Sequence, residues 1–535
     1  MKQIEIPYAE ERGARYRFFE MLPGILSWTV LALPFGLSFI DPRLTAFVII
    51  TYLLLWFIKS IGLQIRAVQG FRRMHQHMKL SWDDLLADLQ SPGENVSLLD
   101  PPDWHIENLA RRSNQTYPVN PSDLLHAVII AAYNEAREVL EPTIKSVLAA
   151  KTDAKNMILV IAYEGRDGAK SEKPATELVK EYGHLFRHAM AVKHPLNERE
   201  VRGKGGNITF AARKLQEYLQ QKQIDPKNVI VTTLDSDNRP HPHYFNCVSY
   251  LFSVAPDPIK VSYQPIPMFT NNIWDAPAPM RVIATGNSFW MVVQSLRTHM
   301  LRNFSAHAQS MQALIDTDFW SVRTIVEDGH QFWRTYFRYD GQHEVYPVLL
   351  PIYQDAVLSS SYRKTLKAQF IQLRRWAWGA SDVAYVAEKG FFTKNNVPKI
   401  DALMKFFRLL EGHVSWATAP LILAFSAFVP LILDPSDFTA HQLPIIASRI
   451  QTVAMAGIFI TLFFSIKTLP PKPARYKAHR RVFMIIQWVY LPVTTIIYSA
   501  FSAINSQTRL IFGRYLDKFD VTDKAVITED NKRVM

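Results

Sequence analysis

The sequence predicts an α/β domain with a mostly parallel sheet, placed between two groups of transmembrane helices. Between about 124 and 400, short apolar runs rich in β-branched residues alternate with stretches of helix length, a pattern typical of parallel strands joined by crossover helices. Long uncharged apolar runs stand before and after this part, each close to the ~20 residues that a helix needs to cross a bilayer. The strand-like runs end in polar residues, which predicts a ligand site at their carboxyl ends.

The composition favours anionic partners. The chain has 535 residues and a formal net charge of +12, and such an excess attracts acidic lipid surfaces, phosphorylated substrates or nucleic acid. No low-complexity Lys/Arg arm is present, and the basic residues flank apolar segments. We therefore expect membrane lipids and phosphorylated substrates, and no nucleic acid. Cys247 is the only cysteine, which excludes an intrachain disulfide and fits a reducing compartment.

Five apolar runs are predicted to be membrane spans. Two form an N-terminal hairpin at 22–40 and 44–65, joined by a turn of three residues, and three follow the α/β domain at 414–433, 450–466 and 482–503. The predicted organisation is a cytosolic segment at 1–21, a transmembrane hairpin at 22–65, a juxtamembrane linker at 66–123, the α/β domain with its interfacial helices at 124–400, about three transmembrane helices at 401–505, and a tail at 506–535.

Basic residues predict which side the α/β domain occupies. The N-terminus, the stretch after the second run and the loop at 467–481 are all rich in Lys and Arg, so all three are expected in the cytosol. The protein is then an integral protein of the cell or inner membrane with a cytosolic α/β domain. Five complete spans would put the C-terminal tail outside, although it carries Arg509, Arg514, Lys518 and Lys524. Either the tail is outside, or one C-terminal run does not cross.

The central candidate for chemistry is a pair of aspartates. The apolar run 229–234 stops at Asp235, and Asp237 follows one residue later. Two carboxylates at a strand end suit Mg²⁺, which takes one or two protein carboxylates and completes its shell with water and substrate phosphates. The alternative is a solvated Asp-rich turn. A second such pair, Asp316 and Asp318, lies in mixed polar and aromatic sequence and is read as a chance occurrence.

Three further motifs each allow a functional and a structural interpretation. The turn 203–207 places Lys204 between glycines ahead of a helix, where backbone N–H groups and a cation can meet phosphate, or where a flexible turn simply exposes a lysine. Glu327 and Asp328 begin a helix, either as caps that complement its dipole or as a general base. Gln372, Arg375 and Trp376 share one helix face, which suits a diphosphate and a ring or the membrane interface.

The order of these motifs resembles the membrane-embedded inverting glycosyltransferases of family 2, which include cellulose, chitin and hyaluronan synthases. The resemblance rests on Tyr-Asn-Glu at 133–135, Gly-Lys-Gly-Gly-Asn at 203–207, Asp-Ser-Asp at 235–237, Glu-Asp at 327–328 and Gln-x-x-Arg-Trp at 372–376. It covers about 124–380 well and implies a GT-A-like, Rossmann-like domain that uses a nucleotide-sugar donor. The tail at 519–524 also looks like the Phe-x-Val-Thr-x-Lys gating-loop motif of cellulose synthases, which is cytosolic in that family.

The resemblance implies roles for the residues that surround the donor. Tyr133, Asn134 and Glu135 would border the nucleotide, and Lys204 would approach its phosphates. Glu164 would stand near the base, although the chain has Tyr-Glu-Gly at 163–165 where the family has Asp-Asp-Gly, the pattern tied to uracil.

It also implies the residues of the reaction itself. Asp235 and Asp237 would bind Mg²⁺ or Mn²⁺ on the donor diphosphate, and Asp235 would contact the donor. Asp328 would be the catalytic base and Arg375 would contact the diphosphate. Trp376 would sit by the acceptor, with Gln372 in support.

The expected function is a metal-dependent, inverting hexosyltransferase that extends a polysaccharide or glycolipid at the cytosolic face. One alternative is a non-processive enzyme that loads a single sugar onto a lipid carrier. Another is a membrane scaffold or transporter with a degenerate transferase domain, against which the four intact residues Asp235, Asp237, Asp328 and Arg375 argue.

Overall fold

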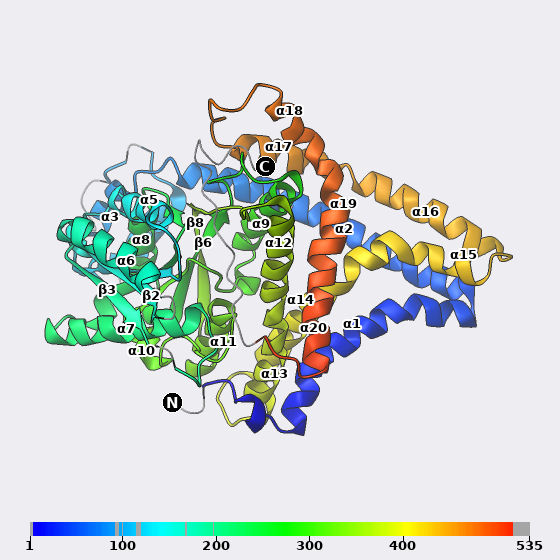
Figure 1. Ribbon diagram of the computed structural model, residues 1–535, viewed down its shortest axis with the longest axis horizontal. Coiled ribbons are helices and arrows are strands. Elements are labelled where there is room, and N and C mark those ends of the chain that lie inside the picture. The colour runs from blue at the N-terminus through cyan, green and yellow to red at the C-terminus, as the bar shows by residue number, and fades with distance from the viewer. Residues whose placement is uncertain are drawn as a thin grey trace.

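An eight-stranded mixed sheet forms the centre of the α/β domain (Figure 1). The computed structural model describes residues 4–90, 96–98, 100–113, 119–165, 168–195 and 197–516. The strands are β1 (Leu125–Ala132), β2 (Met157–Glu164), β3 (His188–His194), β4 (Val229–Asp235), β5 (Arg239–Pro240), β6 (Val261–Met268), β7 (Ala308–Ser310) and β8 (Glu344–Tyr353). Their order in the sheet is β3-β2-β1-β4-β7-β6-β8-β5.

The sheet is mostly parallel, which confirms the predicted fold class. Strands β3, β2, β1 and β4 pair in parallel, as do β6 and β8. The short β7 runs antiparallel between β4 and β6, and β5 runs antiparallel to β8. Because β7 is antiparallel to both β4 and β6, strands β6 and β8 point the same way as β1 to β4.

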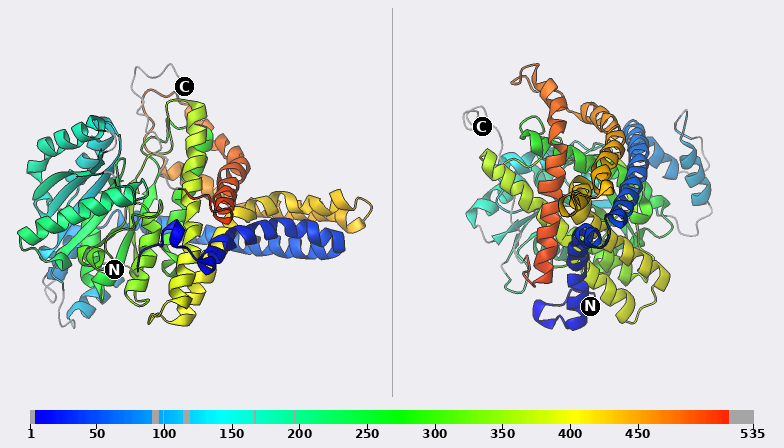
Figure 2. Two further views of the ribbon diagram at one scale, coloured as in Figure 1. Left: turned by 60° about the horizontal axis from the view of Figure 1, so that its bottom comes forward. Right: turned by 90° about the vertical axis from the view of Figure 1, so that its right-hand side faces the viewer.

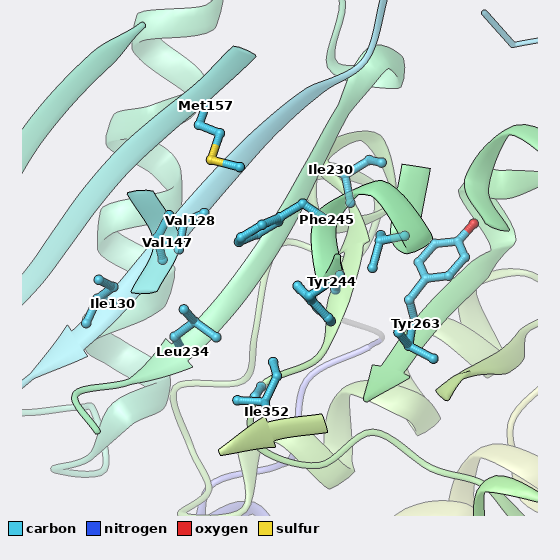
Figure 3. Close-up of a cluster of buried hydrophobic side chains, with 14 of the residues drawn as sticks. Val128, Ile130, Val147, Met157, Ile230, Leu234, Tyr244, Phe245, Tyr263 and Ile352 are labelled. Carbon is cyan, nitrogen blue, oxygen red and sulfur yellow. The ribbon is translucent and has the colours of Figure 1, made fainter. Parts of the chain in front are cut away.

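Helices cover both faces of the sheet, and alternate residues of each strand pack against opposite layers. One layer holds α5 (Arg137–Leu148), α6 (Ala169–Tyr182) and α8 (Tyr244–Val254); Val128 and Ile130 of β1 join Phe245 in its core (Figure 3). The other face packs on α7 (Lys204–Gln221) and α10 (Met311–Asp316). Burial on both faces is why β1 and β2 read as continuous apolar runs.

Strand β6 is longer than its local sequence pattern predicts. The run 259–263 predicts a strand and the proline-containing stretch 265–279 predicts a loop, but β6 continues through Pro265 and Pro267 to Met268. Proline cannot donate to a strand ladder, so it is confined to places with an unpaired side. Beyond Tyr263, β6 pairs only with β8, and its other side accommodates the prolines.

The sequence pattern of 280–315 predicts a helix, but this region is only partly helical. Helix α9 (Ala278–Ser295) ends before the segment 301–307, which has no regular structure and returns to the sheet as β7. The domain is completed by α11 (Glu327–Arg338), α12 (Tyr362–Ala377) and α13 (Asp382–Ala387). The stretch expected as a linker contains α3 (Trp82–Gln90) and α4 (Asp103–Ser113), and α3 buries Trp82 and Leu85 in the main core.

Five helical stretches are long and apolar enough to cross a membrane, all within the described residues. They are α1 (Ala14–Ile40), α2 (Pro42–His77), α14 with α15 (Lys399–Phe425 and Val429–Leu433), α16 with α17 (Phe438–Ala454 and Gly457–Thr468), and the stretch 480–511, which contains α18 (Arg480–Ile486), α19 (Leu491–Val493) and α20 (Phe501–Ile511). Many of their side chains are exposed apolar groups, which water would disfavour and lipid accepts.

The stretch 480–511 differs from the other four. Helices α1, α2 and α16 extend away from the α/β domain, whereas 480–511 runs crosswise to them (Figures 1 and 2). At its start, Arg480 donates to the carbonyl oxygen of Trp274 at 3.1 Å. At its end, Arg17 at the base of α1 donates to the carbonyl oxygen of Leu510 at 3.0 Å. Both ends therefore lie on the side of the α/β domain.

The N-terminal segment 4–12 packs beneath α11. The Glu5 carboxylate accepts a hydrogen bond from the buried guanidinium of Arg334 at 2.8 Å. Ile6 joins an apolar cluster with Phe332, and the Tyr385 hydroxyl donates to the carbonyl oxygen of Ile4 at 2.6 Å. This segment thus supports the helix whose first turn carries Glu327 and Asp328.

Candidate functional site

The polar residues predicted to share a site lie at the carboxyl ends of β1, β2 and β4. In the sheet register Ala131 pairs with Asp235 on one side and with Ala162 on the other. The loops after the three strands therefore start at the same edge. This is where a mostly parallel sheet binds ligands.

Asp235 is the last residue of β4 and contacts a cation. Lys204, the first residue of α7, places its Nζ 2.7 Å from the Asp235 Oδ1. The Ser305 hydroxyl donates to Oδ2 of the same carboxylate. The backbone N–H of Asp235 donates to the Asn238 side chain at 2.9 Å, which closes the turn after the strand. Lys204 is 10% exposed and the Asp235 side chain 35%, so the carboxylate keeps an open face.

Asp237 is more deeply placed. It is 8% exposed, and its Oδ2 accepts a hydrogen bond from the backbone N–H of Asp355 at 2.9 Å. Its carbonyl oxygen accepts from the Asn271 side chain at 2.9 Å. Asp355 follows β8, so Asp237 links the carboxyl ends of β4 and β8.

Asp235 and Asp237 are the residues at this edge that could hold a hard divalent cation. No group of three or more His, Cys, Asp or Glu side chains forms a metal-binding arrangement in the part of the chain that the structure describes. Mg²⁺ needs only one or two protein carboxylates when phosphates complete its shell, and Asp235 and Asp237 can supply them. In this structure the Asp235 carboxylate forms an ion pair with the ammonium of Lys204.

Glu327 and Asp328 lie opposite the Asp pair, in the first turn of α11. Burial, with the neighbouring Asp328 carboxylate, raises the pKa of Glu327 to about 8. Burial also raises the pKa of Asp328, and the cations Lys204 and Arg375 offset this only in part. Asp328 Oδ1 accepts a hydrogen bond from the N–H of Gly329 at 2.7 Å. The helix start thus holds two carboxyl groups of raised proton affinity, as a general base requires.

Lys204 lies among three carboxylates. Burial alone would lower the pKa of its ammonium, but Asp235, Glu327 and Asp328 raise it above its ordinary value. Close packing explains the glycine beside it: a Cβ on Gly205 would lie 2.4 Å from the Ser321 carbonyl oxygen. Glycine therefore lets the N-terminus of α7 approach the segment that leads to α11.

Helix α12, which carries the Gln-x-x-Arg-Trp motif, packs against the apolar helix α20. Arg375 is close enough to Asp328 to favour its ionised form. Trp376 packs on Phe269, with ring centroids 6.2 Å apart, in a cluster that includes Met484 of α18. Gln372 accepts a hydrogen bond from Gln369 at 3.0 Å on the same helix. Arg375 thus lies toward Asp328, and Trp376 lies toward the apolar helices.

The loop after β1 is fastened to the Asp pair. Glu135 accepts hydrogen bonds from the backbone N–H of Tyr133 at 2.6 Å and from the Ser236 hydroxyl at 3.0 Å. Ser236 stands between Asp235 and Asp237. Glu135 therefore shapes the loop, while Asn134 is exposed at its tip.

Glu164 ends β2 beside a buried histidine that the sequence analysis did not single out. The His194 Nδ1 lies 3.6 Å from Glu164 Oε2, and its Nε2 lies 2.9 Å from Glu200 Oε2. Burial alone would lower the pKa of His194, but the two carboxylates raise it to about 9. The end of β2 therefore has a histidine of raised pKa beside Glu164.

The gating-loop-like motif at 519–524 lies outside the described residues. The chain before it ends close to the site: Tyr515 packs edge-on against Trp378, with ring centroids 6.4 Å apart. Leu510 joins a buried cluster with Val326 and Trp378. The last described residues, Tyr515 and Leu516, thus lie next to the segment that leads to Glu327 and Asp328.

Comparisons with known proteins found weak likenesses to solved structures. No family model and no curated protein matches the chain. A mannosyltransferase from Pyrobaculum calidifontis in complex with GDP-Man and Mn²⁺ is 14% identical, with a TM-score of 0.38 over 83% of this chain and 98% of that one. S. aureus TarS 1–349 in complex with UDP-GlcNAc is 13% identical, with a TM-score of 0.35 over 75% of this chain and 95% of that one. Since both TM-scores are below 0.5, we base the function of this chain on its own geometry.

Several residues at the site escaped sequence reasoning. Ser305 reaches Asp235 from a segment without regular structure, and His194 ends an edge strand of weak apolar pattern. His330 of α11 pairs with Asp382 of α13 at 2.7 Å, although 52 residues separate them. A local signal did exist at β8. Its apolar run is followed directly by Gln354 and Asp355, a pattern that predicts a further strand ending in polar residues at the site.

Proposed function

We propose that this protein is a membrane-embedded glycosyltransferase that moves a sugar from a nucleotide-sugar donor to a polysaccharide or glycolipid acceptor at the cytosolic face. The observation that carries the proposal is the convergence of Lys204, Asp235 and Asp328 at the carboxyl edge of the sheet. Such a site combines anion-binding cations, a carboxylate pair for a metal and a carboxylate for a proton. We also propose that the chain is an inverting glycosyltransferase of family 2, with the residue roles given below.

The donor diphosphate is bound by charge. Asp235 and Asp237 would hold Mg²⁺ or Mn²⁺, which neutralises the charge of the departing diphosphate. Arg375 and Lys204 donate hydrogen bonds to the same phosphates, and such charge-assisted bonds are among the strongest in proteins. Stabilising the charge of the leaving group is usually the largest contribution to rate.

Asp328 acts as the base. Its carboxylate accepts the proton of an acceptor hydroxyl, the oxygen of which attacks the anomeric carbon as the bond from that carbon to the diphosphate breaks. One displacement on the face opposite the leaving group inverts the anomeric configuration. The raised pKa of Asp328 increases its affinity for the proton in this step.

The acceptor arrives from the membrane side. Trp376 packs against Phe269 between the site and the apolar helices, so a sugar ring bound there would lie next to both. We propose that α1, α2, α14–α15 and α16–α17 cross the membrane and that the stretch 480–511 lies along its surface, since both ends of that stretch contact the α/β side. The N-terminus, the α/β domain and residues 512–516 are then all cytosolic.

A direct assay tests the proposal. Purified protein in nanodiscs is given a panel of nucleotide sugars with Mg²⁺ or Mn²⁺, and release of nucleotide diphosphate is measured. We expect release with a specific donor, abolished by EDTA and reduced at least ~10³-fold by Asp328→Asn, in line with loss of a general base. Asp318→Asn is the matched control, because the Asp318 side chain is 42% exposed, forms an ion pair with the exposed Arg213 and has a positive φ that Asn tolerates. Equal activity of the two variants would refute the assignment of Asp328.

The size of the product separates the two transferase alternatives. A polymer indicates processive synthesis, and a single added sugar indicates transfer to a lipid carrier. Absence of donor binding by calorimetry, in folded protein, would favour the scaffold alternative.

A further inference from the structure

A group of arginines lies where the long apolar helices meet the α/β domain. The arginine cluster consists of Arg66 on α2, Arg297 and Arg302 in the segment after α9, and Arg408 on α14. Helices α2 and α9 lie against each other here (Figure 1), and Arg408 of α14 is near enough to act on the charges of Arg297 and Arg302. The four side chains therefore come from three parts of the chain.

The charges of the arginine cluster are not balanced by carboxylates. Two carboxylates stand nearby, but Glu411 already pairs with Lys59 at 3.1 Å and Asp401 with Lys405 at 2.6 Å. Among the described residues, no ion pair joins Arg66, Arg297 or Arg408 to a carboxylate. The cluster thus keeps a net positive charge in a partly buried place, which is unfavourable without an anion.

The cations influence one another. Burial and the nearby Arg66 and Arg408 lower the pKa of Arg297, and burial and Arg408 lower the pKa of Arg302 to about 10. Arg302 also lies over the rings of Phe332 and Trp333, 4.0 and 4.8 Å from their centroids, which fixes the position of its guanidinium. Packing therefore holds the Arg302 guanidinium in place despite its repulsion by the neighbouring arginine.

The depth of the cluster matches the phosphate layer of a bilayer. From Pro42 at the far end of α2 to Lys59 is about 25 Å of helix, close to the thickness of a hydrocarbon core. Lys59 and Glu411 then lie near the boundary of that core. Arg66 lies about two turns further toward the cytosol, at the depth of lipid head groups.

We infer that the arginine cluster is a binding site for the phosphoryl group of a lipid. Guanidinium groups match phosphate oxygens in pairs and are favoured for this task. Basic pockets between helices on the cytoplasmic side are suited to anionic head groups. The source of the phosphoryl group is either an anionic membrane lipid or a phosphorylated long-chain acceptor. This inference rests on membrane embedding and does not need the transfer reaction.

Native mass spectrometry of the protein released from nanodiscs tests the site. The discs contain phosphatidylcholine alone, or phosphatidylcholine with phosphatidylglycerol, or with a prenyl monophosphate. We expect one phosphorylated lipid to be retained in preference to phosphatidylcholine, and the double variant Arg297→Gln/Arg408→Gln to reduce its affinity at least ten-fold. Preferential retention of the glycerolipid would indicate a structural head-group site. Preferential retention of the monophosphate would indicate a site for the acceptor.

A matched control separates a site from diffuse attraction. Lys477→Gln/Arg481→Gln removes the same charge from exposed residues of the basic loop at the same membrane face, and should leave retention unchanged. Equal losses in both double variants, or no preference over phosphatidylcholine, would overturn the inference. If the arginine variant does not fold, Arg408→Lys keeps the charge but loses the planar fork. It should then weaken retention, while Lys477→Arg should not.

Discussion

The Nζ of Lys204 lies 2.7 Å from the Oδ1 of Asp235, so the lysine of the glycine-rich turn forms an ion pair with the last residue of β4. The same ammonium is close enough to Glu327 and Asp328 to be stabilised by both. One side chain thus links the proposed metal ligands to the proposed base. In the proposed function, binding of a donor with its metal would change this contact, because two cations would compete for one carboxylate.

Lys204→Gln should separate metal binding from donor binding. Without the ammonium, Asp235 has no competing cation, and we expect Mn²⁺ alone to bind several-fold more tightly. The donor should bind less tightly, because one charge-assisted hydrogen bond to phosphate is lost. Calorimetric titrations with Mn²⁺ and with donor measure both. Lys214→Gln on the same helix, an exposed lysine, is the control, and weaker Mn²⁺ binding by Lys204→Gln would contradict the competition.

Gly205→Ala should disturb the site through packing. The new Cβ would lie 2.4 Å from a backbone oxygen of Ser321, which cannot swing away as a side-chain end can. We expect Gly205→Ala to lower the melting temperature and to reduce activity, because α7 and the start of α11 must separate. Gly286→Ala is the matched control: no atom lies within 4 Å of its added Cβ, and alanine is favoured over glycine inside a helix. Similar effects of both substitutions would show that the close approach is unimportant.

His194 should make stability depend on pH. Its pKa in the folded protein is raised to about 9 from an ordinary value of 6.5. A raised histidine pKa contributes stability fully below pH 6.5 and loses it as pH rises through 9. The melting temperature of the wild type should therefore fall more between pH 7 and about 9.5 than that of His194→Gln. Parallel curves for the two proteins would mean that the imidazolium is not stabilised by Glu164 and Glu200.

Glu5→Gln should show that the N-terminal segment supports the catalytic helix. Arg334 is 1% exposed and pairs with Glu5 at 2.8 Å, and removal of one partner from a buried pair typically costs about 3 kcal/mol or more. We expect lower stability by thermal or chemical unfolding and reduced activity, since Arg334 and Asp328 share α11. Glu10→Gln, an exposed residue of the same segment, should have little effect. Unchanged stability of Glu5→Gln would rule out this support.

Cysteine labelling should determine the topology. Cys247 is buried and the only cysteine, so Cys247→Ser gives a background for Lys477→Cys and Arg514→Cys, one near each end of the stretch 480–511. An impermeant maleimide should reach both from the side of the α/β domain, while Ser436→Cys at the far turn should react only from the opposite side. Labelling of Lys477→Cys and Arg514→Cys from different sides would mean that this stretch crosses the membrane.

The sequence alone was informative wherever the signal is local. The apolar run that ends at Asp235 became β4, the turn at Lys204 became the start of α7, and the long uncharged runs became helices of membrane-spanning length. In each case neighbouring residues determine the outcome, because burial on both faces of a strand or along a whole helix requires a continuous apolar pattern.

Only the tertiary structure decided which groups meet. Three contacts join residues far apart in sequence: Lys204 with Asp235, His194 with Glu164, and Arg17 with Leu510. The same holds for the crosswise course of 480–511, since an apolar helix can lie along a membrane as well as through it. Composition determines that such a helix is buried in lipid or protein. The contacts at its two ends determine its direction, because they depend on surfaces that exist only after the domain has folded.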